Sequence, residues 1–135
     1  MTNNFNNAFY LIIFIVHFAA YGFYFANCCL NTKNFMKKYG VDKTSATFTR
    51  FIGAALGGSL LMAIYILFRG TDAAWAFFNL VFVQNLMMTV FGFYTLKVDK
   101  LGKVRKSSDE AFIAPGILTV LSAILCFGLA DKIYI

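Results

Sequence analysis

The chain has 135 residues, of which 60% are hydrophobic and 13% are charged. A soluble domain of this length has roughly a quarter of its residues charged, so a large water-soluble core is excluded. The charges gather in short segments between long uncharged ones. The sequence therefore predicts an all-α fold, a single integral membrane domain over 1–135 that forms a four-helix bundle of four transmembrane helices with short loops.

The net charge of +6 resembles that of a nucleic-acid-binding protein. Here, however, the basic residues flank apolar segments, where such residues anchor a protein to lipid headgroups and set its orientation. We therefore expect the lipid bilayer as a partner and no nucleic acid.

The first membrane span is expected at about residues 8–30, after the polar, uncharged segment MTNNFNN. That segment lacks the basic region and the cleavage site of a secretory signal peptide, so the span should remain as a helix.

The segment after the first span contains NFMKKYG, which predicts a short helix capped by Asn34 and ended by Gly40. Phe35, Met36 and Tyr39 are expected to dip into the membrane interface, with the neighbouring lysines facing lipid headgroups.

The second span, at about 50–68, begins at Arg50 and continues in the uncharged run FIGAALGGSLLMAIYILF. Its small residues, among them Gly53, Gly57 and Gly58, let a neighbouring helix approach closely. We expect this face to pack helices together, either within the chain's own bundle or against a partner.

A tight turn at Gly70–Asp72 predicts that the second and third spans form an antiparallel hairpin. The third span is expected at about 73–96 and the fourth at about 111–130. Ser107 and Glu110 are spaced as a capping box at the start of the fourth span.

Ten of the twelve basic residues lie in the two long loops of this scheme, and only Arg69 and Lys132 lie on the opposite side. By the positive-inside rule, both loops should be cytoplasmic and both termini should lie outside. The bacterial inner membrane is the expected location.

His17 is the single histidine and lies near the middle of the first span. An ionisable group at this depth marks a candidate functional site. Tyr21 and Tyr24 share its helix face, at spacings of four and three residues. A neutral histidine on such a face could ligate a haem or chlorophyll, or hydrogen-bond a quinone.

The structural alternative is a hydrogen bond from His17 to an amide of the third span, at Asn79, Gln84 or Asn85. Asn85 and Thr89 share a face of that span and are expected to act as polar contacts between helices. The same polar groups could also line a path for a solute.

Cys28 and Cys29 are expected at one end of the bundle and Cys126 at the other, too far apart for a disulfide. Adjacent cysteines without further ligands make a poor zinc site. We therefore predict no metal and interpret the thiols as small packing residues.

No span carries Asp, Glu, Lys or Arg in its middle. This excludes a small proton-coupled exporter, because such a protein needs a carboxylate within the membrane. The sequence also lacks a serine–histidine–acid set, a cluster of metal ligands and a phosphate-binding loop. We therefore expect no catalytic residues and no enzyme.

From Asn34 to Leu61 the pattern NFMKKYGV…TRFIGAALGGSLL resembles the DUF4345-like group, small four-helix bacterial membrane proteins of unknown function. In that group a Phe/Tyr-Gly loop precedes an Arg-led, glycine-rich second helix. The resemblance implies a four-span fold and no activity.

Three functions remain open from the sequence. The leading hypothesis is a non-enzymatic accessory or structural subunit of a membrane protein complex, or a homo-oligomer, because four short helices offer little besides lipid-facing surfaces. The alternative is a membrane protein that binds a cofactor or lipophilic ligand, such as haem, chlorophyll or quinone, through the His17 face. A channel or transporter for a neutral solute is the weaker alternative.

Overall fold

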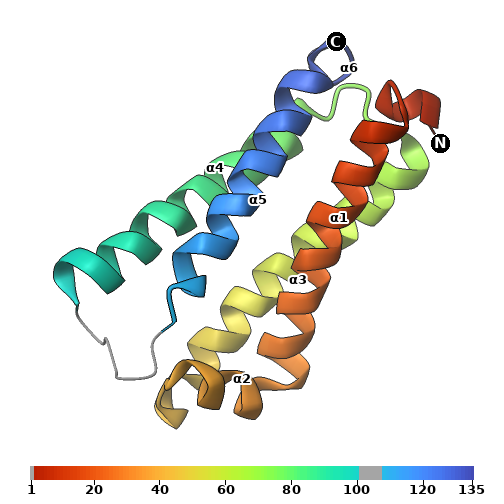
Figure 1. The fold of residues 1–135 in the computed structure, drawn as a ribbon. Helices are drawn as coiled ribbons and strands as arrows, with labels where there is room; N and C mark the ends of the chain where they lie inside the picture. The colour runs from red at the N-terminus through yellow and green to blue at the C-terminus, as the bar shows by residue number, and fades with distance from the viewer. Residues whose placement is uncertain (1, 101–107) are drawn as a thin grey trace.

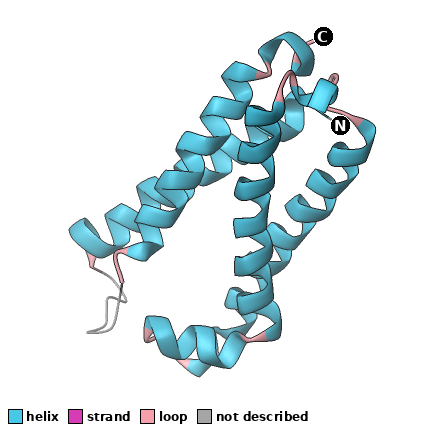
Figure 2. Cartoon of the chain, turned by 45° about the vertical axis from the view of Figure 1, so that its right-hand side comes forward, coloured by secondary structure: helices cyan, strands magenta, loops and turns pink. Residues whose placement is uncertain are grey.

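The computed structural model describes residues 2–100 and 108–135, and its regular elements there are all helical (Figure 1, Figure 2). The long helices are α1 (Ala8–Phe25), α3 (Ala46–Arg69), α4 (Trp75–Phe93) and α5 (Glu110–Gly128). The short ones are α2 (Thr32–Tyr39) and α6 (Ala130–Ile133). Brief turns extend them, namely the 3-10 turns η1 (Thr2–Phe5) and η3 (Lys43–Ser45) and the π-helical turns η2 (Ala26–Leu30) and η4 (Tyr94–Asp99).

Four helical segments of the described chain are long and apolar enough to cross a membrane. Their outward faces expose large apolar side chains, among them Leu61, Leu80 and Phe91, each more than half exposed. An apolar surface of this extent is a liability in water and suits lipid. The predicted all-α fold with four spans is confirmed, and the chain is a multi-pass membrane protein in contact with the lipid bilayer.

The long helices form two pairs, α1 with α3 and α4 with α5, and α1 also contacts α5. Figure 1 shows the pairs together at the end that carries both termini and apart at the end where α2 lies. The hairpin expected of the second and third spans is therefore not the main pairing. The turn after α3 instead crosses the terminal end of the bundle. There the Thr71 hydroxyl donates to the Asn4 carbonyl, and the Ala73 N–H donates to the Lys132 carbonyl at 3.2 Å.

The short helix α2 ends where the sequence predicted but begins earlier. Gly40 follows it with a φ of 66°, a left-handed conformation that glycine adopts without strain. Asn34, the predicted cap, lies inside the helix, and its amide donates to the Asn31 side chain at 2.8 Å. The helix begins at Thr32 because the chain continues directly from η2, with the Thr32 hydroxyl donating to the Cys28 carbonyl at 2.6 Å.

Glycines bring α3 close to α1 and to η2, which continues α1. A Cβ at Gly53 would stand 2.5 Å from the Cβ of Cys28, and one at Gly57 would stand 2.6 Å from the Phe25 ring. At these two positions the small-residue face serves the chain's own bundle. The next residue points about 100° away around the helix. Gly58 is accordingly exposed, and nothing in the described structure lies within 4 Å of where its Cβ would be.

α4 and α5 also approach each other at a glycine. Pro115 lies within α5 and has no N–H to donate to the Ala111 carbonyl one turn earlier. Gly92 of α4 lies against that carbonyl, where a Cβ would come within 2.6 Å of the oxygen. Further along the same interface Thr89 and Thr119 place their Oγ atoms 3.2 Å apart, so Thr89 takes part in an interhelical contact.

The predicted capping box at the start of α5 is only partly within the described residues. Ser107 lies outside the described residues, and it is the Ser108 hydroxyl that accepts the Glu110 N–H, at 3.2 Å. Among the described residues, the Glu110 carboxylate contacts Tyr24 of α1 and Lys38 of α2.

Candidate ligand-binding cavity

Three polar side chains of the membrane spans form one buried chain of hydrogen bonds. The Tyr21 hydroxyl on α1 donates to Asn85 Oδ1 on α4 at 3.0 Å. The Asn85 amide nitrogen lies 3.1 Å from His17 Nε2. All three residues are at most 1% exposed. The structural alternative for His17, a bond to an amide of the third span, is therefore present, and its partner is Asn85.

This chain of bonds gives His17 a defined tautomer. Because Asn85 Oδ1 accepts from Tyr21, the Asn85 nitrogen donates and His17 Nε2 accepts, which places the ring proton on Nδ1. Nδ1 is buried and makes no hydrogen bond within the described residues. His17 Nε2 is thus not free to ligate a haem or chlorophyll. No group of three metal-binding side chains occurs in the part of the chain that the structure describes.

A cavity of about 470 Å³ lies between the two helix pairs, at the end of the bundle where α2 lies. Residues of all five helices from α1 to α5 line it, and its wall is mostly apolar, as at Leu56 and Leu118. Tyr21 and Asn85 reach it from the inner end. Pockets that bind small molecules have volumes of roughly 300–1,000 Å³, so this one is large enough for a ligand.

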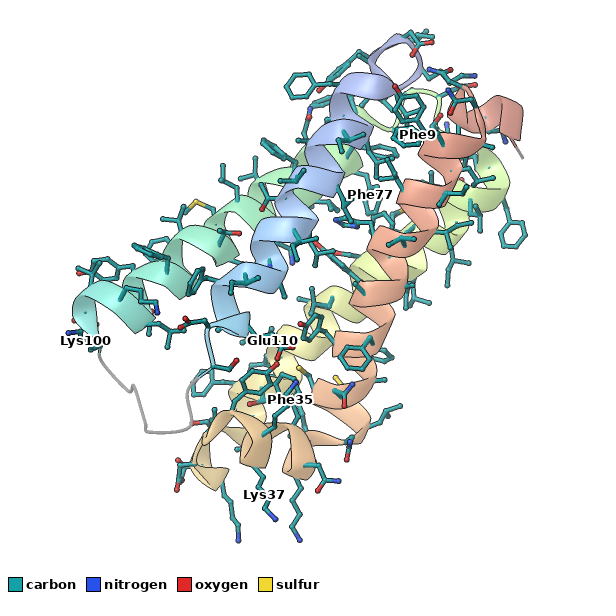
Figure 3. The ribbon with its side chains drawn as sticks, in the orientation of Figure 1. Phe9, Phe35, Lys37, Phe77, Lys100 and Glu110 are labelled. Carbon is teal, nitrogen blue, oxygen red and sulfur yellow. The ribbon has the colours of Figure 1, made fainter. Side chains whose placement is uncertain are left out.

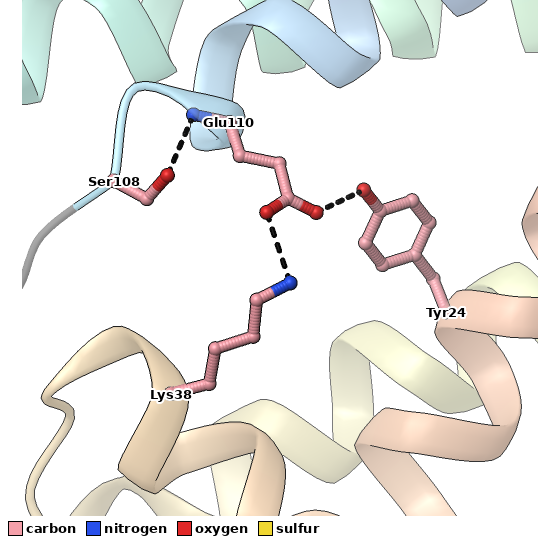
Figure 4. A network of polar contacts seen from close by, with 4 residues as sticks. All are labelled: Tyr24, Lys38, Ser108 and Glu110. Atoms are coloured by element: carbon pink, nitrogen blue, oxygen red, sulfur yellow. Dashed lines mark hydrogen bonds and ion pairs between the residues drawn. The ribbon is translucent and has the colours of Figure 1, made fainter.

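Polar side chains from three helices meet at the mouth of this cavity (Figure 4). Glu110 accepts from the Tyr24 hydroxyl through Oε1 at 3.1 Å, and it forms an ion pair with Lys38 through Oε2 at 3.0 Å. These contacts connect α5 to α1 and α2 across the opening.

α2 turns its apolar side into the bundle, although the sequence predicted that it would face the membrane interface. Phe35 and Tyr39 line the cavity, and Met36 is only 5% exposed. Figure 3 shows Phe35 near the start of α5, whereas Lys37 points away from the bundle. Burial, together with the nearby Glu110 carboxylate, raises the pKa of Tyr39, so its phenol stays protonated at neutral pH.

Only some of the site residues proposed from the sequence line this cavity. Tyr21 and Tyr24 line the cavity, while His17 lies behind Tyr21 and does not. Cys28 lines the cavity as well, and it is a free thiol like Cys29. Cys126 is also a free thiol and is buried.

Sequence reasoning missed the three side chains around the mouth, because it assigned Glu110 to a helix cap, Lys38 to lipid headgroups and Tyr39 to the interface. One signal was available. Phe35 and Tyr39 are spaced four residues apart beside Lys38, which places aromatic rings and an ammonium group on adjoining faces of one helix. Nothing in the sequence indicated that Glu110, 72 residues beyond Lys38, would join them.

The chain matches no family model, no curated protein and no solved structure. The resemblance to the DUF4345-like group therefore has no family match to support it. The described residues do form four helices that are long and apolar enough to cross a membrane.

Proposed function

We propose that this membrane protein is a non-enzymatic binding protein for a lipophilic molecule, held in the cavity between the two helix pairs. The observation that carries the proposal is the cavity itself, about 470 Å³ in volume and mostly apolar. The cavity is partly open to its surroundings, and an apolar pocket of this volume suits an apolar ligand.

The polar groups suit a long molecule with a polar head. Tyr24 and Glu110 stand at the mouth, and Tyr21 and Asn85 stand at the inner end. Asn85 has a second amide hydrogen besides the one directed at His17, and it can donate that hydrogen to a ligand carbonyl. These polar groups support a quinone or another lipophilic ligand, one of the alternatives predicted from the sequence. Haem and chlorophyll would lack a free histidine ligand.

Gentle extraction from the native membrane, followed by native mass spectrometry, tests this proposal. We expect a lipophilic molecule to remain bound to the chain. Thr49 lines the cavity and Thr47, on the same helix, is exposed and does not. Thr49→Trp should therefore abolish retention, and Thr47→Trp should not. A chain that carries no ligand, or equal retention in both variants, would overturn the proposal.

We further propose that the cavity opens toward the cytoplasmic side of the bacterial inner membrane. Figure 3 shows Lys37 and Lys100, from the two basic loops, at the cavity end of the bundle, and both termini lie at the other end (Figure 1). The positive-inside rule then supports cytoplasmic loops and external termini. A reporter fused after Ile135 should be active only outside the cytoplasm, and cytoplasmic activity would contradict this orientation.

A second candidate function, a structural subunit or homo-oligomer, has one observation in its favour. Ala54 and Gly58 of α3 are exposed and one turn apart, the spacing of small residues at helix contacts within membranes. Gly58→Leu should then weaken a native complex without unfolding the chain, as judged by migration in native gels. Gly57→Leu does not test assembly, because Gly57 lies against Phe25 of the same chain.

A further inference from the structure

The mouth of the cavity favours one sign of charge. Among the described residues that line the cavity, Glu110 is the one charged side chain. We propose, resting on the proposed function, that the ligand is an amphiphile with an ammonium head. The head binds Glu110 in place of the Lys38 ammonium group, and the apolar part of the ligand fills the cavity toward Leu56 and Leu118.

Lys38 already shows how an ammonium group is held at this position. Its Nζ lies 3.0 Å from Glu110 Oε2 and 5.0 Å from the centre of the Tyr39 ring. A carboxylate beside aromatic faces suits an ammonium ion, because ion pairing and cation–π attraction act together. Tyr24 and Phe35 add further aromatic surface to the lining.

Lys38 can leave this position at small cost. Its side chain is 55% exposed, and an exposed ion pair contributes little net stability because water solvates both charges. Glu110 keeps its orientation when Lys38 leaves, since Tyr24 continues to donate to Oε1. A carboxylate at the edge of an apolar cavity then favours a cationic head over a neutral or anionic one.

The overall charge of the chain works against this preference, which makes the test selective. The net charge of +6, concentrated in the loops, attracts anionic amphiphiles to the protein surface. A preference for a cationic amphiphile therefore cannot arise from the overall charge and requires a local site.

The test uses the full chain in uncharged dodecyl maltoside micelles at neutral pH. Spin-labelled stearylamine, stearyl alcohol and stearic acid share one hydrocarbon chain and differ in the charge of the head. Their association is measured from the motionally restricted component of the electron paramagnetic resonance spectrum. We expect the amine to bind most tightly, the alcohol next and the acid least.

Spin-labelled phosphatidylethanolamine distinguishes two sources of the ammonium group. Binding as tight as that of stearylamine supports the headgroup of a membrane lipid as the ligand. Binding of stearylamine alone supports a free long-chain amine.

Two variants and one matched control locate the preference. Lys38→Met removes the internal competitor and should raise affinity for the amine by up to about fivefold, the factor that corresponds to an exposed ion pair of about 0–1 kcal/mol. Glu110→Gln should abolish the preference and leave the alcohol bound. Lys97→Met is the control and should leave affinity unchanged, because Lys97 forms a similar ion pair at 2.8 Å with Asp109, which unlike Glu110 does not line the cavity.

The outcomes separate this inference from the function on which it rests. Equal saturable binding of all three probes would overturn the ammonium preference while supporting a lipophile-binding cavity. Absence of saturable binding for every probe would overturn both. The comparison of probes on the unmodified chain decides the inference even where a variant fails to fold.

Discussion

At the end of the bundle that carries the termini, Phe5, Leu129 and Ile133 have no exposed surface, whereas at the other end a cavity of about 470 Å³ separates the two helix pairs. The terminal end is closed by η1, whose Phe5 ring lies 4.8 Å from the ring of Phe14, and by α6. The Asn6 amide also donates to Asp131 at 2.7 Å. Side-chain packing and polar contacts thus act together at this end.

The two ends differ in what brings the helices together. At the terminal end a Cβ on Gly128 of α5 would stand 2.1 Å from the Tyr10 ring of α1, so the ring packs directly against the α5 backbone. At the other end α1 and α5 are joined by the bond between Tyr24 and Glu110, and the longer connections leave room between the pairs. Close packing therefore holds the helices together at the terminal end. At the other end, polar side-chain contacts join helices that are separated by the cavity.

The largest effect is expected from an aromatic residue of the closed end. Phe5→Ala should lower the free energy of unfolding by about 3–5 kcal/mol, because it leaves a cavity where no surface is exposed. Phe48→Ala is the matched control, since Phe48 lines the open end and is 70% exposed. Unfolding in mixed dodecyl sulfate and dodecyl maltoside micelles measures both. Equal losses in the two variants would remove the distinction between the ends.

A smaller decrease in the free energy of unfolding is expected from a glycine at which α3 packs closely against the end of the first span. Gly53→Ala should cost about 1–3 kcal/mol, because the added methyl group collides with the Cys28 and Cys29 side chains. Gly58→Ala should be neutral or stabilising, because its Cβ enters open space. The same unfolding assay applies. A destabilised Gly58→Ala chain would show that this face is covered in the folded protein.

Asn85→Leu probes the polar chain at the inner end of the cavity. The substitution removes the hydrogen-bond partner of both Tyr21 and His17. Polar contacts between membrane helices contribute about 0.6 kcal/mol each on average, so the free energy of unfolding should fall by roughly 1 kcal/mol. Asn79→Leu serves as the control, because the bond of Asn79 to Tyr134 is exposed. An Asn85→Leu chain as stable as the parent would mean that these bonds do not join α1 to α4.

The smallest change in stability is expected from Lys38→Met at the open end. An exposed ion pair contributes about 0–1 kcal/mol, so this variant and Lys97→Met should both unfold close to the parent. A loss as large as that of Phe5→Ala would show that the mouth network holds the fold, and Lys38 could then not give way to a ligand.

Features that depend on local composition could be predicted from the sequence. The four spans follow from uncharged runs of helix-spanning length, and the end of α2 follows from Gly40, whose left-handed φ few other residues tolerate. The contact between His17 and Asn85 was one of three named possibilities. Few polar groups lie in the spans, and those that do are stabilised by bonding to one another.

Features that depend on how the helices pair could not be predicted. Glu110 stands at a helix start in either case. The sequence therefore could not show whether its carboxylate caps the helix or reaches Lys38 on α2. The inward side of α2 was assigned to lipid because an amphipathic helix suits either a membrane interface or a bundle. From the sequence, Gly57 could pack against a partner protein or within its own chain. The structure places the Phe25 ring beside it, so Gly57 packs within the chain.

A tryptophan moved into the cavity tests the central claim most directly. The chain has a single tryptophan, Trp75, which is 52% exposed at the start of α4. In the double variant Trp75→Phe with Phe35→Trp, the indole would instead stand at the cavity wall, and its fluorescence is titrated with a brominated long-chain alcohol in uncharged micelles. A ligand-binding cavity predicts that quenching of the indole at position 35 saturates at an equimolar amount of probe. In the parent chain, quenching of Trp75 should be gradual and unsaturated. Gradual, unsaturated quenching of both indoles would contradict it.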